Sequence, residues 1–253
     1  MTRSTPPAKA ASASGAPWEG SSTRRGFLSN GLRGAGLLAL GGLACDSNRP
    51  HAGFLGVMER VNERFQRALF DPTRLAPELG EDEETDLEDF PKYKISPAFP
   101  VAPAGWRLAV GGLVARPLTL SAGDLQRLPR TRTRVRHHCV EGWSAVASWD
   151  GVRLSEIARA AGVDPRARYV EFRSFDAGYS SSWDLESALH PQTILAYGMD
   201  GQPLPIEHGA PLRLYAAVKL GYKMVKYLTE VNFLPVRSGG YWEDRGYEWF
   251  AGV

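Results

Sequence analysis

One cysteine beside two histidines is the clearest candidate for chemistry in this chain of 253 residues. Cys139 directly follows His137 and His138 in the segment RHHCVEGWS, residues 136–144. A thiolate is a soft ligand that suits transition metals, and nearby positive charge favours it by lowering the pKa of the thiol. Three arginines alternate along the expected strand before it and would supply that charge: Arg132, Arg134 and Arg136. Structural zinc normally takes four Cys or His ligands, so the other ligands of a metal here would come from a cofactor.

Two other roles for Cys139 stay open on these residues alone. A Cys–His hydrolase is one of them, because His138, His190 and His208 occur in the same chain, although no local motif supports it. A buried structural cysteine is the other.

A second cluster, of basic residues, indicates an anionic ligand. No acidic residue lies between His208 and Lys226, and Gly209 and Gly221 allow a ligand to approach the backbone closely. Arg213 can bind a phosphate through two hydrogen bonds, whereas a lysine acts as a point charge. The lysines of this segment are Lys219, Lys223 and Lys226. We therefore predict a site for a phosphorylated cofactor, although neither a Walker loop nor a dinucleotide fingerprint is present; a solvated basic strand and turn is the alternative.

The first 45 residues are predicted to be a twin-arginine export signal. Arg24 and Arg25 stand in the segment STRRGFL, and the apolar segment GAGLLALGGLA follows at residues 34–44. Its eleven residues suit the core of a signal peptide and are too few for a membrane span of about 20 residues. A weakly hydrophobic, Gly-rich core is typical of twin-arginine signals. A disordered basic tail followed by a short buried helix is the alternative.

We therefore expect a periplasmic or otherwise exported protein. Cys45 follows Leu43 and Ala44, which loosely resembles a lipoprotein processing site, so a lipid anchor at Cys45 and simple cleavage nearby are two alternatives. If Cys45 is lost or lipidated, no intramolecular disulfide can form, because Cys139 is the other of the two cysteines. The 208 residues left (253 minus 45) suit a single domain. A formal net charge of +2 predicts neither nucleic-acid binding nor strong attraction to a membrane.

The rest of the chain divides into an N-terminal extension at residues 46–90, draped over a main domain at residues 91–253. In the extension, apolar residues at helical spacing predict a helix over residues 51–70, and the acidic run EDEETDLED at residues 81–89 predicts a solvated loop. In the main domain, apolar spacing predicts a helix from Leu154 to Ala161 that ends at Gly162.

Short strands dominate the remainder of the main domain. The pair Asp150-Gly151 predicts a turn. Alternation and β-rich composition predict strands at residues 106–110, 169–172, 212–218 and 227–233. Many short strands with few helices indicate an α+β domain built on mixed sheets. The loop at residues 175–183 is expected to shape an entrance through Asp176, Tyr179 and Trp183.

Four groups of residues follow one another in a familiar order: CVEGWS from Cys139, WDGV from Trp149, YVEFRS from Tyr169, and GQPLPIEHGAPLRL from Gly201 with GYKMVK from Gly221. Together they resemble the sulfite oxidase family of molybdenum enzymes, most closely its exported bacterial branch, which includes protein-methionine-sulfoxide reductase catalytic subunits. The resemblance implies a sulfite oxidase-like molybdopterin-binding domain over residues 91–253. It also implies a single molybdenum-molybdopterin without a nucleotide.

The same resemblance implies roles for individual residues. Cys139 would be the molybdenum ligand and, with His138 beside it, the catalytic position. The residues that would contact the pterin or its phosphate are Ser174, His208, Arg213, Met224, Val225 and Lys226, with Lys94 and Ser96 from an earlier segment.

The implied activity is transfer of an oxygen atom to or from a small substrate or sulfoxide. Electrons would be exchanged with a separate protein, either a haem membrane subunit or a c-type cytochrome, because the chain lacks a Cys-x-x-Cys-His motif. A sulfite-oxidising dehydrogenase is an alternative, although the arginine and asparagine pattern of such enzymes is replaced here by VEGW. A cofactor-free binding module and a Cys–His thiol enzyme are alternatives of another class.

Overall fold

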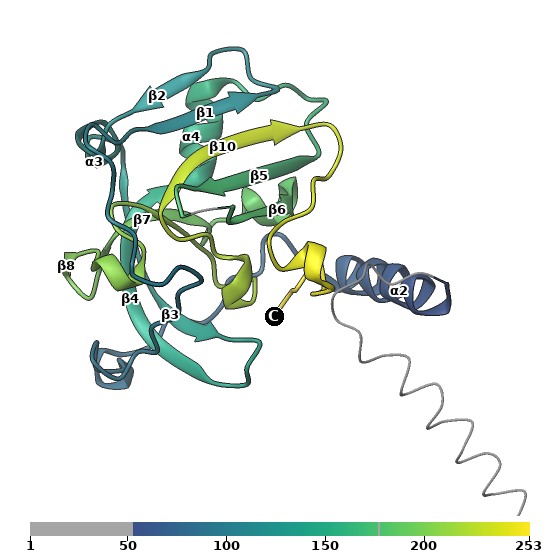
Figure 1. The fold of residues 1–253 in the computed structure, drawn as a ribbon, viewed down its shortest axis with the longest axis horizontal. Coiled ribbons are helices and arrows are strands. Elements are labelled where there is room, and N and C mark those ends of the chain that lie inside the picture. The colour runs from purple at the N-terminus through teal and green to yellow at the C-terminus, as the bar shows by residue number, and fades with distance from the viewer. Residues whose placement is uncertain (1–52, 177) are drawn as a thin grey trace, which may run out of the picture. The chain divides into compact units, whose positions relative to one another are not determined.

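The computed structural model describes residues 53–176 and 178–253 (Figure 1). The predicted export signal, Cys45 and the first residues of the predicted helix at 51–70 lie outside these ranges. Within them, no helix combines the length and apolar character needed to cross a membrane.

Two five-stranded sheets form the described part of the main domain. In the first sheet, in the order β2-β1-β10-β5-β6, β1 and β10 run parallel and the other neighbours antiparallel, so this sheet is mixed. Its strands are β1 (Leu108–Gly112), β2 (Leu118–Leu120), β5 (Tyr169–Ser174), β6 (Ser180–Asp184) and β10 (Leu228–Leu234).

The second sheet is antiparallel throughout. Its order is β3-β4-β7-β8, with β9 paired to β7. Its strands are β3 (Arg130–His138), β4 (Ser144–Arg153), β7 (Ile194–Met199), β8 (Gln202–Pro203) and β9 (Arg213–Tyr215).

Helices are few and mostly short in the described chain. The α-helices are α2 (Phe54–Leu69), α3 (Ala122–Gln126), α4 (Leu154–Ala161) and α5 (Leu185–Ala188). Single turns of 3-10 helix are η1 (Glu81–Glu83), η2 (Ile206–His208), η3 (Gly221–Lys223) and η4 (Glu243–Arg245). The α+β class with mixed sheets and few helices is thus confirmed.

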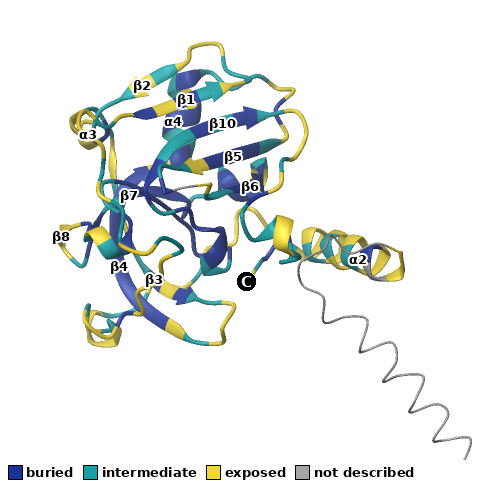
Figure 2. Cartoon of the chain, viewed as in Figure 1, coloured by how far each residue is buried: buried dark blue, intermediate teal, exposed yellow. Residues whose placement is uncertain are grey.

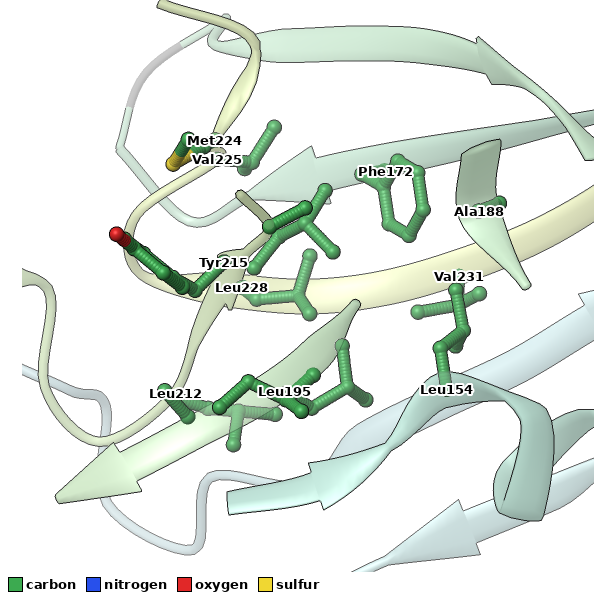
Figure 3. Packing of buried hydrophobic residues seen from close by; sticks show 14 of the residues in the cluster. Leu154, Phe172, Ala188, Leu195, Leu212, Tyr215, Met224, Val225, Leu228 and Val231 are labelled. Atoms are coloured by element: carbon green, nitrogen blue, oxygen red, sulfur yellow. The ribbon is translucent and has the colours of Figure 1, made fainter. Parts of the chain in front are cut away.

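The apolar core joins the two sheets. Phe172 of β5 and Val231 of β10 belong to the same buried cluster as Leu195 of β7 and Leu154 of α4 (Figure 3). The strands that carry them are dark along much of their length in Figure 2, which marks buried residues. In β10, buried Val231 and Phe233 alternate with half-buried Asn232 and Leu234, which explains why the alternating pattern locates this strand.

Several predicted boundaries shift by one to three residues. The predicted strand at 106–110 is β1, that at 227–233 is β10, and that at 212–218 shortens to the three residues of β9. The helix from Leu154 to Ala161 is confirmed, and Gly162 ends it in the left-handed conformation at φ 65°.

The turn predicted at Asp150-Gly151 is wrong, because both residues lie inside β4. Pairing with β7 shifts register between them, and Gly151 faces Ala196. A Cβ atom on Gly151 would lie 2.2 Å from the carbonyl oxygen of Leu195, so a glycine at this position allows β4 and β7 to approach each other closely. Asp150 faces two arginines of β3, Arg130 and Arg132, with which it forms ion pairs.

The acidic run is more than a solvated loop. It contains η1, and Glu84 and Glu81 form ion pairs with Arg134, while Glu83 lies 4.0 Å from Arg136. The backbone amide of Thr85 also donates to Val146 of β4 at 2.9 Å. Acidic side chains of the N-terminal extension therefore bind the basic face of β3.

Candidate active site

One pocket brings together segments that are far apart in the sequence. The residues that line it come from the chain before β1 (Phe90, Pro91, Tyr93, Lys94, Ile95), from β3 and the turn after it (His137, Cys139, Val140, Glu141, Trp143), from the end of β5 and the next loop (Ser174, Asp176, Tyr179), and from the C-terminal third (His208, Arg213, Gly221, Tyr222, Met224, Lys226, Tyr227, Trp242, Tyr247).

Cys139 occupies a tight turn between β3 and β4. Its backbone amide donates to the carbonyl of Trp143 at 3.0 Å, and Gly142, at φ 90°, donates to the carbonyl of Cys139 at 3.1 Å. The half-buried thiol lies 3.7 Å from the carboxylate of Glu141, which also accepts a 3.0 Å hydrogen bond from the indole of Trp143. The turn thus holds the thiol on the pocket wall beside an acidic group.

The arginines before Cys139 do not supply the positive surroundings that the sequence predicts. Arg132 and Arg134 are held by carboxylates of Asp150 and Glu84, on the face of β3 that meets the acidic run. Burial raises the pKa of the Cys139 thiol, and the Glu141 charge adds to that effect. A thiolate here therefore depends on a positive ligand such as a metal ion.

Arg213 is the charged centre of the pocket. It is 5% exposed, and its guanidinium lies 4.7 Å from the ring centroid of Trp149. Its Nη1 donates to the carbonyl of His208 at 2.9 Å, while its Nε has no hydrogen-bond partner among the described residues. No carboxylate among residues 53–176 and 178–253 pairs with it, and burial lowers its pKa to about 10. This charge is balanced by nothing in the described chain.

Further nitrogen groups surround Arg213. Lys226 Nζ donates to the carbonyls of Glu207, at 2.9 Å, and of Tyr93, and burial followed by the charge of Arg213 lowers the pKa of Lys226 to about 7. Burial likewise lowers the pKa of His137 to about 3 and that of His208 to about 4. Both histidines are thus neutral at physiological pH.

Most of the predicted pterin-contacting residues line this pocket. Ser174, His208, Arg213, Met224, Lys226 and Lys94 do so together with Cys139. Three predicted residues are not among the lining side chains: His138, Ser96 and Val225. Since side chains alternate along β3, His137 faces the pocket in place of His138. Ser96 hydrogen-bonds to Asp176, which does line the pocket, and Val225 is fully buried in the core (Figure 3).

Two lysines of the predicted phosphate cradle have a different role. Lys223 forms a buried ion pair with Glu243, and Lys219 pairs with Asp184 at 3.3 Å and donates to the carbonyl of Phe250 at 2.7 Å. Both lysines are at most 1% exposed and neither lines the pocket. The local sequence groups both lysines with Arg213, because their carboxylate partners Asp184 and Glu243 lie far away along the chain.

These pairs fix the C-terminal segment against the pocket mouth. Trp242 and Tyr247 of this segment line the pocket, and Trp242 packs at 6.3 Å from the ring of Tyr93. No local sequence signal predicted this aromatic rim, and Glu141 was not predicted as a site residue although it stands in the CVEGWS motif. Asp176 and Tyr179 line the pocket as predicted, whereas Trp183 is buried in β6 and donates to the carbonyl of Lys223.

The residues present fit a phosphorylated pterin. Buried polar atoms normally have partners, but here His208 Nε2, Arg213 Nε and the hydroxyl of Tyr227 have none in the described chain. All three residues line one pocket that holds two buried cations, Arg213 and Lys226. An anionic, hydrogen-bonding ligand would satisfy these atoms and offset the buried charge.

Comparison with known proteins agrees with this geometry. The family described as oxidoreductase molybdopterin binding domain matches residues 96–242. A solved structure, the sulfane dehydrogenase SoxCD from Paracoccus pantotrophus, superposes with a TM-score of 0.50 at 27% identity over 52% of this chain and 38% of that chain. The chain belongs to the sulfite oxidase family and is a molybdopterin-binding oxidoreductase.

Named relatives place it near one branch of that family. A putative protein-methionine-sulfoxide reductase subunit YedZ1 of Azospira oryzae is 40% identical over 90% of this chain and 87% of its own length. The uncharacterized oxidoreductase YuiH of Bacillus subtilis is 35% identical over 62% of this chain and 84% of its own length. The catalytic subunit MsrP of Xanthomonas axonopodis is 33% identical over 66% of this chain, which spans 54% of that protein.

We predict that Arg213→Met abolishes retention of the cofactor. Because Arg213 provides the fixed charge at the base of the pocket, pterin content per purified chain should fall at least about tenfold, equivalent to about 1.4 kcal/mol or more of binding free energy. The cofactor-free variant should be as stable as the cofactor-free wild type, since a buried charge without a partner is removed. Pterin fluorescence after oxidation and thermal unfolding measure the two quantities.

Arg159→Met is the matched control, because Arg159 is an exposed arginine on α4. It should retain wild-type pterin content. Equal content in both variants would contradict the assignment of Arg213 to cofactor binding.

We also predict that the cofactor-free chain loses stability as the pH falls from about 6.5 to about 4. In that window the unfolded state, with histidine pKa near 6.5, binds protons that buried His137 and His208 do not bind in the folded state. His208→Gln should make the decline shallower. Free energies of unfolding from urea titrations at several pH values measure this, and identical slopes for the two proteins would refute it.

Proposed function

We propose that this chain is an exported molybdenum enzyme that reduces sulfoxides, with Cys139 as the protein ligand of the metal. The observation that carries the proposal is the Cys139 thiol on the wall of a pocket whose buried cations lack an anion. The names of relatives, two of them given as protein-methionine-sulfoxide reductases or their subunits, support sulfoxide as substrate.

The net reaction uses two electrons and two protons. The sulfur–oxygen bond of the sulfoxide breaks, two O–H bonds of water form, and a thioether remains. When bound, molybdenum-molybdopterin without a nucleotide supplies the two-electron oxygen-atom chemistry. The electrons come from a separate electron-transfer protein, for which we propose a haem membrane subunit or a c-type cytochrome.

The chain supplies binding, orientation and protons. Arg213, Lys226 and neutral His208, which line the pocket, would hold the phosphorylated pterin. Glu141, 3.7 Å from the Cys139 thiol at the exposed side of the turn, would accept the thiol proton or pass it to water when Cys139 becomes a ligand. The same carboxylate can then deliver protons toward the site of sulfoxide reduction.

The pocket mouth suits a neutral substrate. The arginines of β3 that could attract an anion such as sulfite are held by carboxylates, and the Cys139 thiol lies 3.7 Å from the acidic Glu141. Aromatic side chains of Tyr93, Trp242 and Tyr247 form the rim and offer apolar surface to a thioether or sulfoxide.

We further propose export through the signal at residues 1–45, followed by an extension at 46–90 and the catalytic domain at 91–253. Folding and cofactor insertion before export would explain the pairing of a twin-arginine signal with a buried cofactor site. Cys45 is then either a lipid attachment point or removed by cleavage nearby.

We predict that Cys139→Ser lowers methionine-sulfoxide reduction at least about a thousandfold, roughly 4 kcal/mol in the barrier, because the hydroxyl is a poor ligand for the metal. Reduced viologen dye serves as electron donor, and molybdenum and pterin per chain are measured alongside. Val140→Ala, at an exposed neighbour in the same turn, is the control and should stay within about threefold of wild type.

Two results would contradict the proposed function. A wild type without molybdenum, purified from cells that load a control molybdoenzyme, would favour a binding module or a thiol enzyme. A loaded wild type that oxidises sulfite and leaves sulfoxides unchanged would reverse the assigned substrate.

A separate prediction concerns export. Replacing Arg24 and Arg25 together by lysine should leave most of the loaded protein in the cytoplasm, because the arginine pair is the recognised feature of the signal. Arg33→Lys, which changes an arginine of the same segment outside the pair, should not. Immunoblots of cytoplasmic and periplasmic fractions measure the distribution, and equal export of both variants would refute the prediction.

A further inference from the structure

Helix α2 carries an apolar stripe that faces away from the protein. The 3.6-residue period of a helix places six apolar side chains on one face of α2, and each is 47–72% exposed: Phe54, Val57, Met58, Val61, Phe65 and Leu69. Figure 2 shows exposed residues along much of α2. These side chains account for about half of the large apolar side chains that are exposed in the described ranges.

The polar side of α2 is the side that contacts the main domain. Arg237 donates to the carboxylate of Glu63 at 2.6 Å, and the backbone amide of Gly252 donates to the side-chain oxygen of Gln66 at 3.3 Å. Gly56, on the same side, is buried. A surface helix normally does the reverse and turns its apolar side to the core. The stripe therefore contributes nothing to the core, and its exposure indicates another binding partner.

Charge indicates what that partner is. Arg60 and Arg64 are exposed, lie one turn apart along one edge of the stripe, and make no ion pair with any residue in the described ranges. The acidic residues of α2, Glu59 and Glu63, lie toward the opposite side. A helix with a continuous apolar face bordered by free cations suits a surface that is apolar below and anionic above.

We propose that α2 lies in the headgroup region of an anionic lipid bilayer, with its apolar stripe inserted and Arg60 and Arg64 at the phosphates. The stripe extends over the whole helix of 16 residues, about 24 Å long, as an in-plane membrane helix requires. A groove on another protein would instead take a few anchor side chains at one-turn spacing. The apolar stripe is separate from the pocket that contains Cys139, because no residue of α2 lines that pocket.

The position of α2 in the chain agrees with this proposal. The helix begins nine residues after Cys45 (54 minus 45), a length that spans at most about 30 Å. A chain held at Cys45 would keep α2 within reach of the bilayer. The proposal does not require such an anchor, since the stripe and its cations can bind lipid by themselves.

The test measures the depth of single positions of α2 in vesicles. In the cofactor-loaded full chain with Cys45→Ser, Val61→Cys on the stripe and Arg67→Cys on the far side are each labelled with an environment-sensitive fluorophore. The chain without an introduced cysteine controls for labelling of Cys139. Vesicles contain phosphatidylcholine with or without phosphatidylglycerol, and brominated phosphatidylcholine quenches any label that enters the acyl region.

We expect quenching and a blue shift for the Val61→Cys label on vesicles with phosphatidylglycerol, and neither for the Arg67→Cys label. When Phe65→Ser is added to the chain that carries the Val61→Cys label, quenching of the label should need about tenfold more lipid. The reason is that a large apolar contact with the bilayer is lost. Asn62→Ser, a polar position beside the stripe, should leave the lipid requirement unchanged.

Three results would overturn the proposal: equal quenching of both labels, quenching of neither, or equal binding to vesicles with and without phosphatidylglycerol. Quenching of neither label is the outcome expected if a partner protein or residues 34–44 cover the stripe. Sulfoxide reduction by Phe65→Ser in solution should equal that of wild type, so failure here is distinct from failure of the proposed function.

Discussion

The buried guanidinium of Arg213 has no carboxylate partner in the described part of the chain, and the pocket depends on a ligand that supplies the missing anion. A buried charge without a counter-ion costs several kcal/mol, and burial, with the charge of Arg213 as the second cause, lowers the pKa values of its basic neighbours. The pKa of Lys226 falls to about 7 and those of His137 and His208 fall below the physiological range. A bound phosphate would reverse this balance for Lys226 and strengthen its own binding.

Two lysines in the same stretch of sequence as Arg213 form ion pairs and therefore have a structural role. Lys219 and Lys223 are as deeply buried as Arg213, but each has a carboxylate, from Asp184 and Glu243 respectively. Those pairs connect β6 and the C-terminal segment, and they hold the aromatic rim in place. A paired cation stabilises the wall of the pocket, whereas the cation without a partner is free to bind the cofactor.

The charges around Cys139 also favour binding of a positive ligand. Its thiol lies beside Glu141, and the arginines of β3 are held by Asp150 of β4 and by the acidic run of the N-terminal extension. Such an environment raises the pKa of the thiol and favours its neutral form, so binding of a metal ion has to drive loss of the thiol proton. The arginines of β3 are thereby held by carboxylates and do not attract a charged substrate, and this agrees with a neutral sulfoxide.

The sequence by itself determined the α+β class, the family, the helix at residues 154–161, and nine of the 22 residues that line the pocket, because periodic burial and short motifs are local properties. Only the tertiary structure decided which cations are paired, since Lys223 meets Glu243 and Arg134 meets Glu84 across the fold. The alternation of side chains along β3 also decided that His137, and not His138, faces the pocket. At Gly151 the structure has a close contact between two strands where the sequence predicted a turn. Charge balance depends on partners distant in sequence, and no local pattern encodes them.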